Sequence, residues 1–119
     1  MYAEGDLGRK EPAKAFEWIG RAADNGHADA IVDLGVMHEQ GIGVAADPRQ
    51  ATQLYRKAAE AGDARGMRYL AGNLAEGIGT ERDLAESERW YMKAIQAGDE
   101  EAPRLLNELR AKTAQGSKP

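Results

Sequence analysis

The sequence predicts an all-α protein, an α-solenoid of antiparallel helix pairs with a period of 36 residues, and three observations support this class. Residues recur in register, as from Gly41 to Gly77 and from Tyr55 to Tyr91, and no insertion breaks the register between residues 5 and 106. Apolar residues within each unit follow the helical period, and glycine or aspartate marks the helix ends. A fixed period of this length is typical of solenoids, in which each unit buries its apolar face against its neighbours.

Length, charge and composition narrow the class of protein. The 119 residues are enough for one domain, 1–119, with a core of its own. The net charge is −4 and the 16 Lys and Arg residues are scattered, which argues against a nucleic-acid partner. The absence of cysteine excludes disulfides and thiolate metal sites. The first residues lack the apolar stretch of a signal peptide, and no apolar run approaches the roughly 20 residues that cross a bilayer. We therefore expect no membrane partner and a cytoplasmic protein, although an excised piece of an exported protein would look the same.

The register divides the domain into a partial first repeat (1–26), a second repeat (27–62), a third repeat (63–98) and a C-terminal capping helix with a tail (99–119). Residues 1–10 correspond to the end of a unit, because Tyr2 aligns with His38 and Gly5 with Gly41. The first helix of that unit is therefore missing. After this segment we expect a helix at 11–25, with Pro12 in its first turn.

Each complete repeat is predicted to contain two helices. The first helices, at 27–40 and 63–76, end at the Gly-x-Gly turns that begin with Gly41 and Gly77. Asp47 and Asp83 then cap the second helices, with Gln or Glu three residues later as in a capping box. Apolar stripes of helical period mark the expected buried faces: Ala15, Trp18, Ile19, Ala22 and Ala23; Ala51, Leu54, Tyr55, Ala58 and Ala59; Ser87, Trp90, Tyr91, Ala94 and Ile95. The last helix, 100–115, has the polar outer side of an end cap.

These residues resemble the Sel-one-like repeat (SLR) family, which shares helix pairs of this length with the tetratricopeptide repeat. The matching residues are Leu34, Gly35, Gly41, Gly43, Val44, Asp47, Ala51, Tyr55, Lys57, Ala58, Ala59 and Gly62, and then Leu70, Gly77, Gly79, Asp83, Trp90, Tyr91, Lys93, Ala94 and Gly98. The resemblance implies a right-handed superhelix in which the first helix of each pair lines a concave surface. It also implies a non-enzymatic adaptor or scaffold, without cofactors, that binds a protein or peptide.

Motifs for other chemistry have simpler structural explanations. The Gly-x-Gly turns follow helices rather than strands, so they are not phosphate loops. His27 and His38 stand eleven residues apart, whereas a helical metal pair needs i, i+4 spacing. We expect His27 to lie at a helix cap and His38 to lie half in the core. No nucleophile has a general base within a recognisable motif. The sequence thus predicts no catalytic residue, no metal site and no enzymatic activity.

The candidate partner-binding residues are positions on the first helices that vary while the core repeats. They are Val32, Val36, Met37, Arg65, Arg68, Tyr69, Asn73 and, on the last helix, Arg104. Valine and methionine beside arginine and tyrosine favour an interface over an inert surface. Phe16 aligns with Thr52 and is expected outside the buried stripe.

The leading hypothesis is a protein-interaction module whose concave groove binds a protein or peptide. The alternative is a structural or assembly segment, in a larger solenoid or a homodimer, that uses the exposed N-terminal end.

Overall fold

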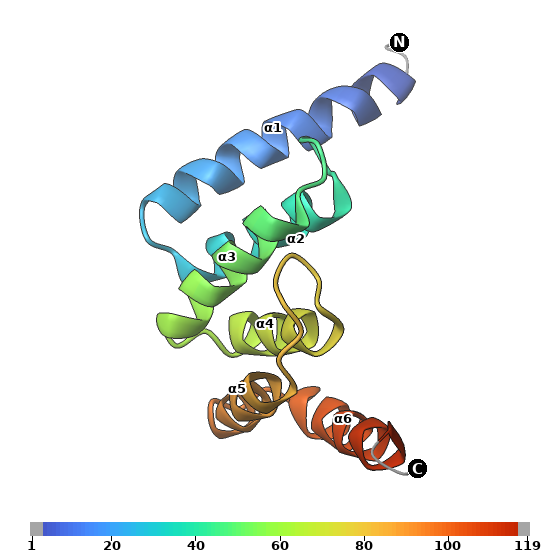
Figure 1. Ribbon diagram of the computed structural model, residues 1–119. Coiled ribbons are helices and arrows are strands. Elements are labelled where there is room, and N and C mark those ends of the chain that lie inside the picture. Colours follow the sequence, from blue (N-terminus) through green and yellow to red (C-terminus); the bar gives the residue numbers. More distant parts are fainter. Residues whose placement is uncertain (1–3, 117–119) are drawn as a thin grey trace.

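The computed structural model describes residues 4–116, with side chains for residues 11–114, and contains six helices and no strand in that range (Figure 1). The helices are α1 (Glu4–Asp24), α2 (Ala28–Gln40), α3 (Pro48–Glu60), α4 (Ala64–Glu76), α5 (Leu84–Gln96) and α6 (Ala102–Gly116). Each helix packs against the next, and α2 also contacts α4, so the molecule is elongated, with extents of 61 × 30 × 23 Å. The predicted all-α solenoid class is confirmed.

Aspartate side chains start the helices of the complete repeats, as the capping patterns predict. Asp47 accepts a hydrogen bond from the backbone N–H of Gln50 at 3.1 Å, and Asp83 accepts one from Glu86 at 2.9 Å. Asp63 caps α4 in the same way. Each cap contributes about 1 kcal/mol, because it satisfies an N–H that has no partner within the helix. His27 does stand at the N-cap of α2, but its side chain makes no capping hydrogen bond.

Backbone hydrogen bonds join the turn after each first helix to the end of that helix, and the turn packs against the second helix of the preceding repeat. The backbone N–H groups of Gly41 and Ile42 donate to Met37 O, and Gly41 has the left-handed φ of 73°. Gly43 also has a positive φ, and a Cβ there would overlap the carbonyl of Pro12. The turn therefore needs glycine both for its backbone conformation and for its contact with the neighbouring repeat.

Helix α1 is longer than predicted and includes the segment that we aligned with a turn. It begins at Glu4 rather than near residue 11, and Pro12 lies inside it rather than in its first turn. In the later repeats, the backbone N–H groups of that segment donate to carbonyls of a first helix, as that of Gly41 does to Met37 O. At 4–10 the segment forms an extension of α1 instead.

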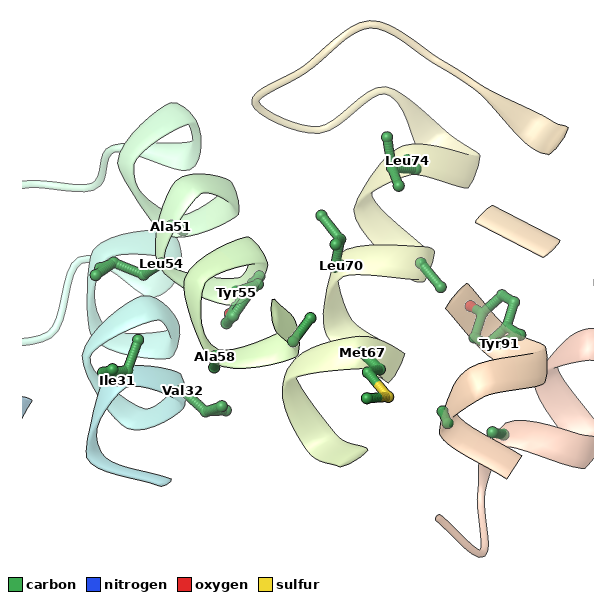
Figure 2. Close-up of a cluster of buried hydrophobic side chains, with 14 of the residues drawn as sticks. Ile31, Val32, Ala51, Leu54, Tyr55, Ala58, Met67, Leu70, Leu74 and Tyr91 are labelled. Atoms are coloured by element: carbon green, nitrogen blue, oxygen red, sulfur yellow. The ribbon is translucent and has the colours of Figure 1, made fainter. Parts of the chain in front are cut away.

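The core runs along the repeats as one continuous cluster of apolar side chains (Figure 2). Tyr55, Leu70 and Leu74 are almost completely buried at its centre. Two buried hydroxyls join neighbouring elements through backbone carbonyls: Thr52 Oγ1 on α3 donates to Ile78 O in the turn after α4 at 2.7 Å, and Ser87 Oγ on α5 donates to Ala71 O on α4 at 2.6 Å. Their hydrogen bonds offset the loss of water that burial would otherwise make costly.

Helix α1 packs differently from its repeat equivalents. Trp18, which we placed in the core, is 64% exposed, whereas the equivalent Leu54 is 9% exposed. Phe16, which we placed outside the buried stripe, is half-buried and meets the ring of His38 edge-on, with centroids 5.5 Å apart. His38 lies half in the core, as predicted, and its Nδ1 atom is buried without a hydrogen-bond partner among the described residues. Ile95 is also more exposed than predicted, at 37%.

Candidate protein-interaction groove

Helices α2, α4 and α6 occupy the first-helix position of successive repeats, and side chains on them join one repeat to the next. Arg65 on α4 donates to Asp33 on α2 at 2.7 Å. Arg68, one helical turn further along α4, donates to Asp99 at 2.9 Å, just before α6. These contacts connect three first helices in a row, which we call the inner face.

Tyr69 lies at the centre of the inner face between an aromatic ring and a cation. Its ring stacks on Tyr55, with centroids 5.1 Å apart and an interplanar angle of 26°. The guanidinium carbon of Arg68 lies 4.8 Å from the centroid of the Tyr69 ring. Tyr55 is anchored in turn, because its hydroxyl donates to Glu39 Oε1 at 2.9 Å. Burial, together with this hydrogen bond, raises the pKa of Tyr55 far above its ordinary value, so the hydroxyl stays protonated and remains a donor.

The two arginines differ in how firmly they are held. The side chains of Arg65 and Asp33 are 42% and 48% exposed, so their ion pair contributes little to stability. Arg68 and Asp99 are only 19% and 7% exposed, and Asp99 also accepts from the N–H groups of Glu101 and Ala102. The hydrogen bond to Asp33 raises the pKa of Arg65. Burial opposes a rise in the pKa of Arg68, but Asp99 and Tyr69 together raise it. Both guanidinium groups therefore present a fixed positive charge beside Tyr69.

Five of the eight predicted partner-binding residues are at least partly accessible. Arg65, Arg68 and Tyr69 form one cluster on α4, and Val36 on α2 is half-buried. Arg104 on α6 is exposed and is held by Glu101 and Glu108, at 2.9 and 2.8 Å. The predicted arginine and tyrosine patch therefore exists as a surface.

The predicted apolar patch does not exist as a surface. Val32 is 0% exposed and Met37 is 7% exposed, so both belong to the buried interior. Asn73 is also buried, at 6%, where its amide donates to Thr52 Oγ1 at 3.0 Å. The reason is that α2 and α4 each contact helices on several sides, so a wide face is buried. Variation between repeats at these positions reflects different core packing and not an exposed surface.

The sequence interpretation missed a cavity of about 130 Å³ at the end of the inner face, between α4, α5 and α6. Gly72, Ala75, Tyr91 and Leu105 are among the residues that line it. The signal was present in the sequence, because three of these positions carry smaller residues than their equivalents one repeat earlier. Only the structure shows that the three changes adjoin one another.

The described part of the chain has neither a metal-binding cluster nor a membrane-spanning helix. No group of three or more His, Cys, Asp or Glu side chains there could hold a metal ion. No described helix is long and apolar enough to cross a membrane.

Comparison with known families agrees with this architecture. The sequence model of the Sel1 repeat matches residues 1–27, 28–63 and 64–99. The chain belongs to the Sel1 repeat family. Sel1 repeat proteins are generally scaffolds for protein–protein interaction and are typically non-enzymatic. A comparison with curated protein sequences found no match.

Several solved Sel1-type structures resemble the chain. A Sel1 repeat protein from Oxalobacter formigenes is 36% identical with a TM-score of 0.72, over 76% of this chain and 37% of that protein. The protective antigen c5321 of uropathogenic Escherichia coli, which displays an SLR fold, is 32% identical with a TM-score of 0.80, over 85% of this chain and 22% of its own. Cysteine-rich protein B of Helicobacter pylori is 27% identical with a TM-score of 0.72, over 76% of this chain and 68% of its own. The chain thus spans well under half of the first two relatives.

Proposed function

We propose that this Sel1 repeat chain is a non-enzymatic adaptor that binds a protein or peptide along the inner face. The observation that carries the proposal is the cluster of Arg65, Arg68 and Tyr69, which is accessible at the middle of the row of first helices. Arginine and tyrosine are among the residue types most enriched at the energetic centres of protein interfaces. Ion pairs and ring stacking already hold these side chains, so little conformational entropy is lost when a partner binds.

The test compares two double variants that remove the same chemistry from opposite faces. Arg65→Ala with Tyr69→Ala removes a cation and an aromatic ring from the inner face. Arg56→Ala with Trp90→Ala removes a similar group from the second helices, where both side chains bond to Glu86. We expect the inner variant to lose captured partners by at least about tenfold, since truncation of an energetically central interface residue costs about 2 kcal/mol or more. The outer variant should capture them normally.

The measurement is quantitative mass spectrometry of proteins retained from a lysate of the source cell, with thermal unfolding as a check of folding. Retention of the same partners by the folded inner variant would contradict the proposal. Equal losses in both variants would do so too, because they would place the contacts outside the inner face.

The exposed face of α1 supports a second proposal, an assembly role for the N-terminal end. Trp18 is 64% exposed and Ile19 is only half-buried, whereas the equivalent Leu54 and Tyr55 are buried against α2. The opposite end of the molecule is different. On α6, the exposed polar residues Asn107 and Arg110 stand where α4 has the buried Ala71 and Leu74. The described part of α6 is therefore polar on the face where α4 is apolar, while α1 offers an apolar face to a further helix.

We propose that this face docks a helix of a second copy or of a larger solenoid, and the second copy gives the direct test. A dimer through α1 should show a molecular mass that falls on dilution, and Trp18→Glu should hold the protein monomeric. The matched control is Met92→Glu, which changes another exposed apolar residue, on α5. A constant monomer mass at all concentrations would rule out the homodimer.

A further inference from the structure

The cavity between α4, α5 and α6 can be compared with the equivalent place one repeat earlier, around Tyr55. Tyr91 at its floor is the repeat equivalent of Tyr55, and both rings are buried, at 5% and 1% exposed. Tyr55 is covered completely by its surroundings, whereas Tyr91 adjoins an opening. The comparison of the two sites identifies the side chains that are smaller around Tyr91 than around Tyr55.

Three positions around Tyr91 carry smaller side chains than the same positions around Tyr55. The pairs, each 36 residues apart, are Val36 and Gly72, Glu39 and Ala75, and Tyr69 and Leu105. Gly72, Ala75 and Leu105 all line the cavity. A Cβ on Gly72 would lie 3.5 Å from the Tyr91 hydroxyl oxygen, so this hydroxyl faces the space that the missing side chain leaves. In the preceding repeat, the larger side chains of Val36, Glu39 and Tyr69 thus occupy the volume that corresponds to the cavity.

The Tyr91 hydroxyl has lost the acceptor that its equivalent uses. Tyr55 donates to Glu39, and Ala75 stands in the place of that glutamate. The hydroxyl of Tyr91 makes no hydrogen bond to the described residues. Burial raises the pKa of Tyr91, and the nearby charges of Glu76 and Glu108 add to the rise while that of Arg68 opposes it, so the hydroxyl is a neutral donor.

Two cations and two acids line the cavity. Arg82 and Lys112 line it, and no described acidic group forms an ion pair with either. Of the two acids in the lining, Glu108 bonds to Arg104 at 2.8 Å, and Arg104 also bonds to Glu101, whereas Glu76 forms no ion pair with the described residues. The equivalents of the two cations one repeat earlier are Ala46 and Glu76. Compared with the interface around Tyr55, the interface around Tyr91 therefore has two additional cations and lacks the carboxylate that Glu39 provides.

We propose that the cavity binds a glutamate side chain of the partner, which supplies the carboxylate that Glu39 supplies in the preceding repeat. The carboxylate accepts from the Tyr91 hydroxyl, with Arg82 and Lys112 at the rim, and the methylene groups lie against Leu84 and Leu105. This inference rests on the proposed function, because the cavity lies between two first helices of the inner face. It adds a specificity pocket for an acidic residue.

The test uses a small probe, N-acetyl-glutamate N-methylamide, titrated into the whole protein by NMR. A probe of this size is expected to bind in about the millimolar range, so about 50 mM is sufficient to reach saturation. We expect saturable shifts at the backbone amides of Gly72, Ala75 and Leu105. The neutral glutamine analogue should bind roughly tenfold more weakly, because a hydrogen bond to a charged acceptor is stronger than one to an amide.

Two substitutions test the mechanism, and one tests its specificity. Tyr91→Phe removes the donor and should weaken probe binding roughly tenfold. Ala75→Glu restores the internal carboxylate of the preceding repeat and should abolish binding by filling the cavity. The matched control is Tyr55→Phe, which should leave binding unchanged because Glu39 already occupies that hydroxyl.

Each outcome supports or overturns the inference. Absence of a saturable shift overturns it, as does equal binding of the glutamine analogue, or less than about threefold weakening by Tyr91→Phe or Ala75→Glu. Failure here is separable from failure of the proposed function. If the Arg65 and Tyr69 variant loses its partners while the probe does not bind, only the glutamate pocket is wrong. If the probe binds while that variant keeps its partners, the inner-face function is wrong.

Discussion

Gly79→Ala is expected to lower the free energy of unfolding by about 3 kcal/mol or more. Gly79 has a φ of 68°, and an alanine in this left-handed region costs about 1–2 kcal/mol. The new Cβ would also overlap the carbonyl of Pro48 and lie 2.7 Å from Thr52 Oγ1, so the turn must move away from α3. That movement disturbs the hydrogen bond from Thr52 to Ile78 O, which holds the two repeats together. Denaturant unfolding followed by circular dichroism measures the loss.

Gly20→Ala is the matched control for this substitution. Gly20 lies inside α1, and a Cβ there would meet nothing within 4 Å. Alanine is favoured over glycine in a helix by about 0.5–1 kcal/mol, so this variant should be slightly stabilised. If both alanine variants changed stability to the same extent, the close approach between turn and neighbouring repeat would not be the cause.

Tyr55→Ala should destabilise the protein by about 4 kcal/mol, the range expected when a large buried aromatic side chain is truncated. Its ring packs against Gly35, whose added Cβ would lie 2.6 Å from the ring, and stacks on Tyr69. The substitution leaves a cavity bounded by α2, α3 and α4, which the neighbouring backbones cannot close without moving. Thermal and denaturant unfolding should show the loss, and Tyr69 should become more mobile by NMR.

The two phenylalanine variants separate the ring from the hydroxyl. Tyr55→Phe should cost about 1 kcal/mol, because Glu39 loses its hydrogen-bond partner. Tyr91→Phe should be nearly neutral, since the Tyr91 hydroxyl has no acceptor among the described residues. Equal losses in the two variants would show that the Tyr91 hydroxyl has an acceptor after all, and would remove the basis of the glutamate pocket.

The two repeat interfaces show how one scaffold can present different surfaces. The contacts that hold the repeats together recur, such as the approach of Gly43 to Pro12 and of Gly79 to Pro48. The side chains above the two core tyrosines do not recur, and they leave one interface filled and the other open. Recognition can therefore differ from repeat to repeat while the backbone stays the same.

Most of the fold follows from the sequence because its determinants are local and repeated. Asp47 and Asp83 cap helices through bonds to residues three positions later, and Gly41 and Gly77 end helices through their own backbone conformation. Such signals act within a few residues, so they can be recognised without knowing the neighbours. Their recurrence after 36 residues then predicts the stacking of helix pairs, and with it the arginine and tyrosine cluster on α4.

Only the tertiary structure decided which apolar residues are covered by another helix. Val32 and Met37 vary between repeats as a surface would, yet they are buried, while Trp18 has the spacing of a core residue and is exposed. Helical period gives the face of a residue, but burial depends on whether another helix covers that face. The cavity beside Tyr91 likewise depends on three residues from α4 and α6 that only packing brings together.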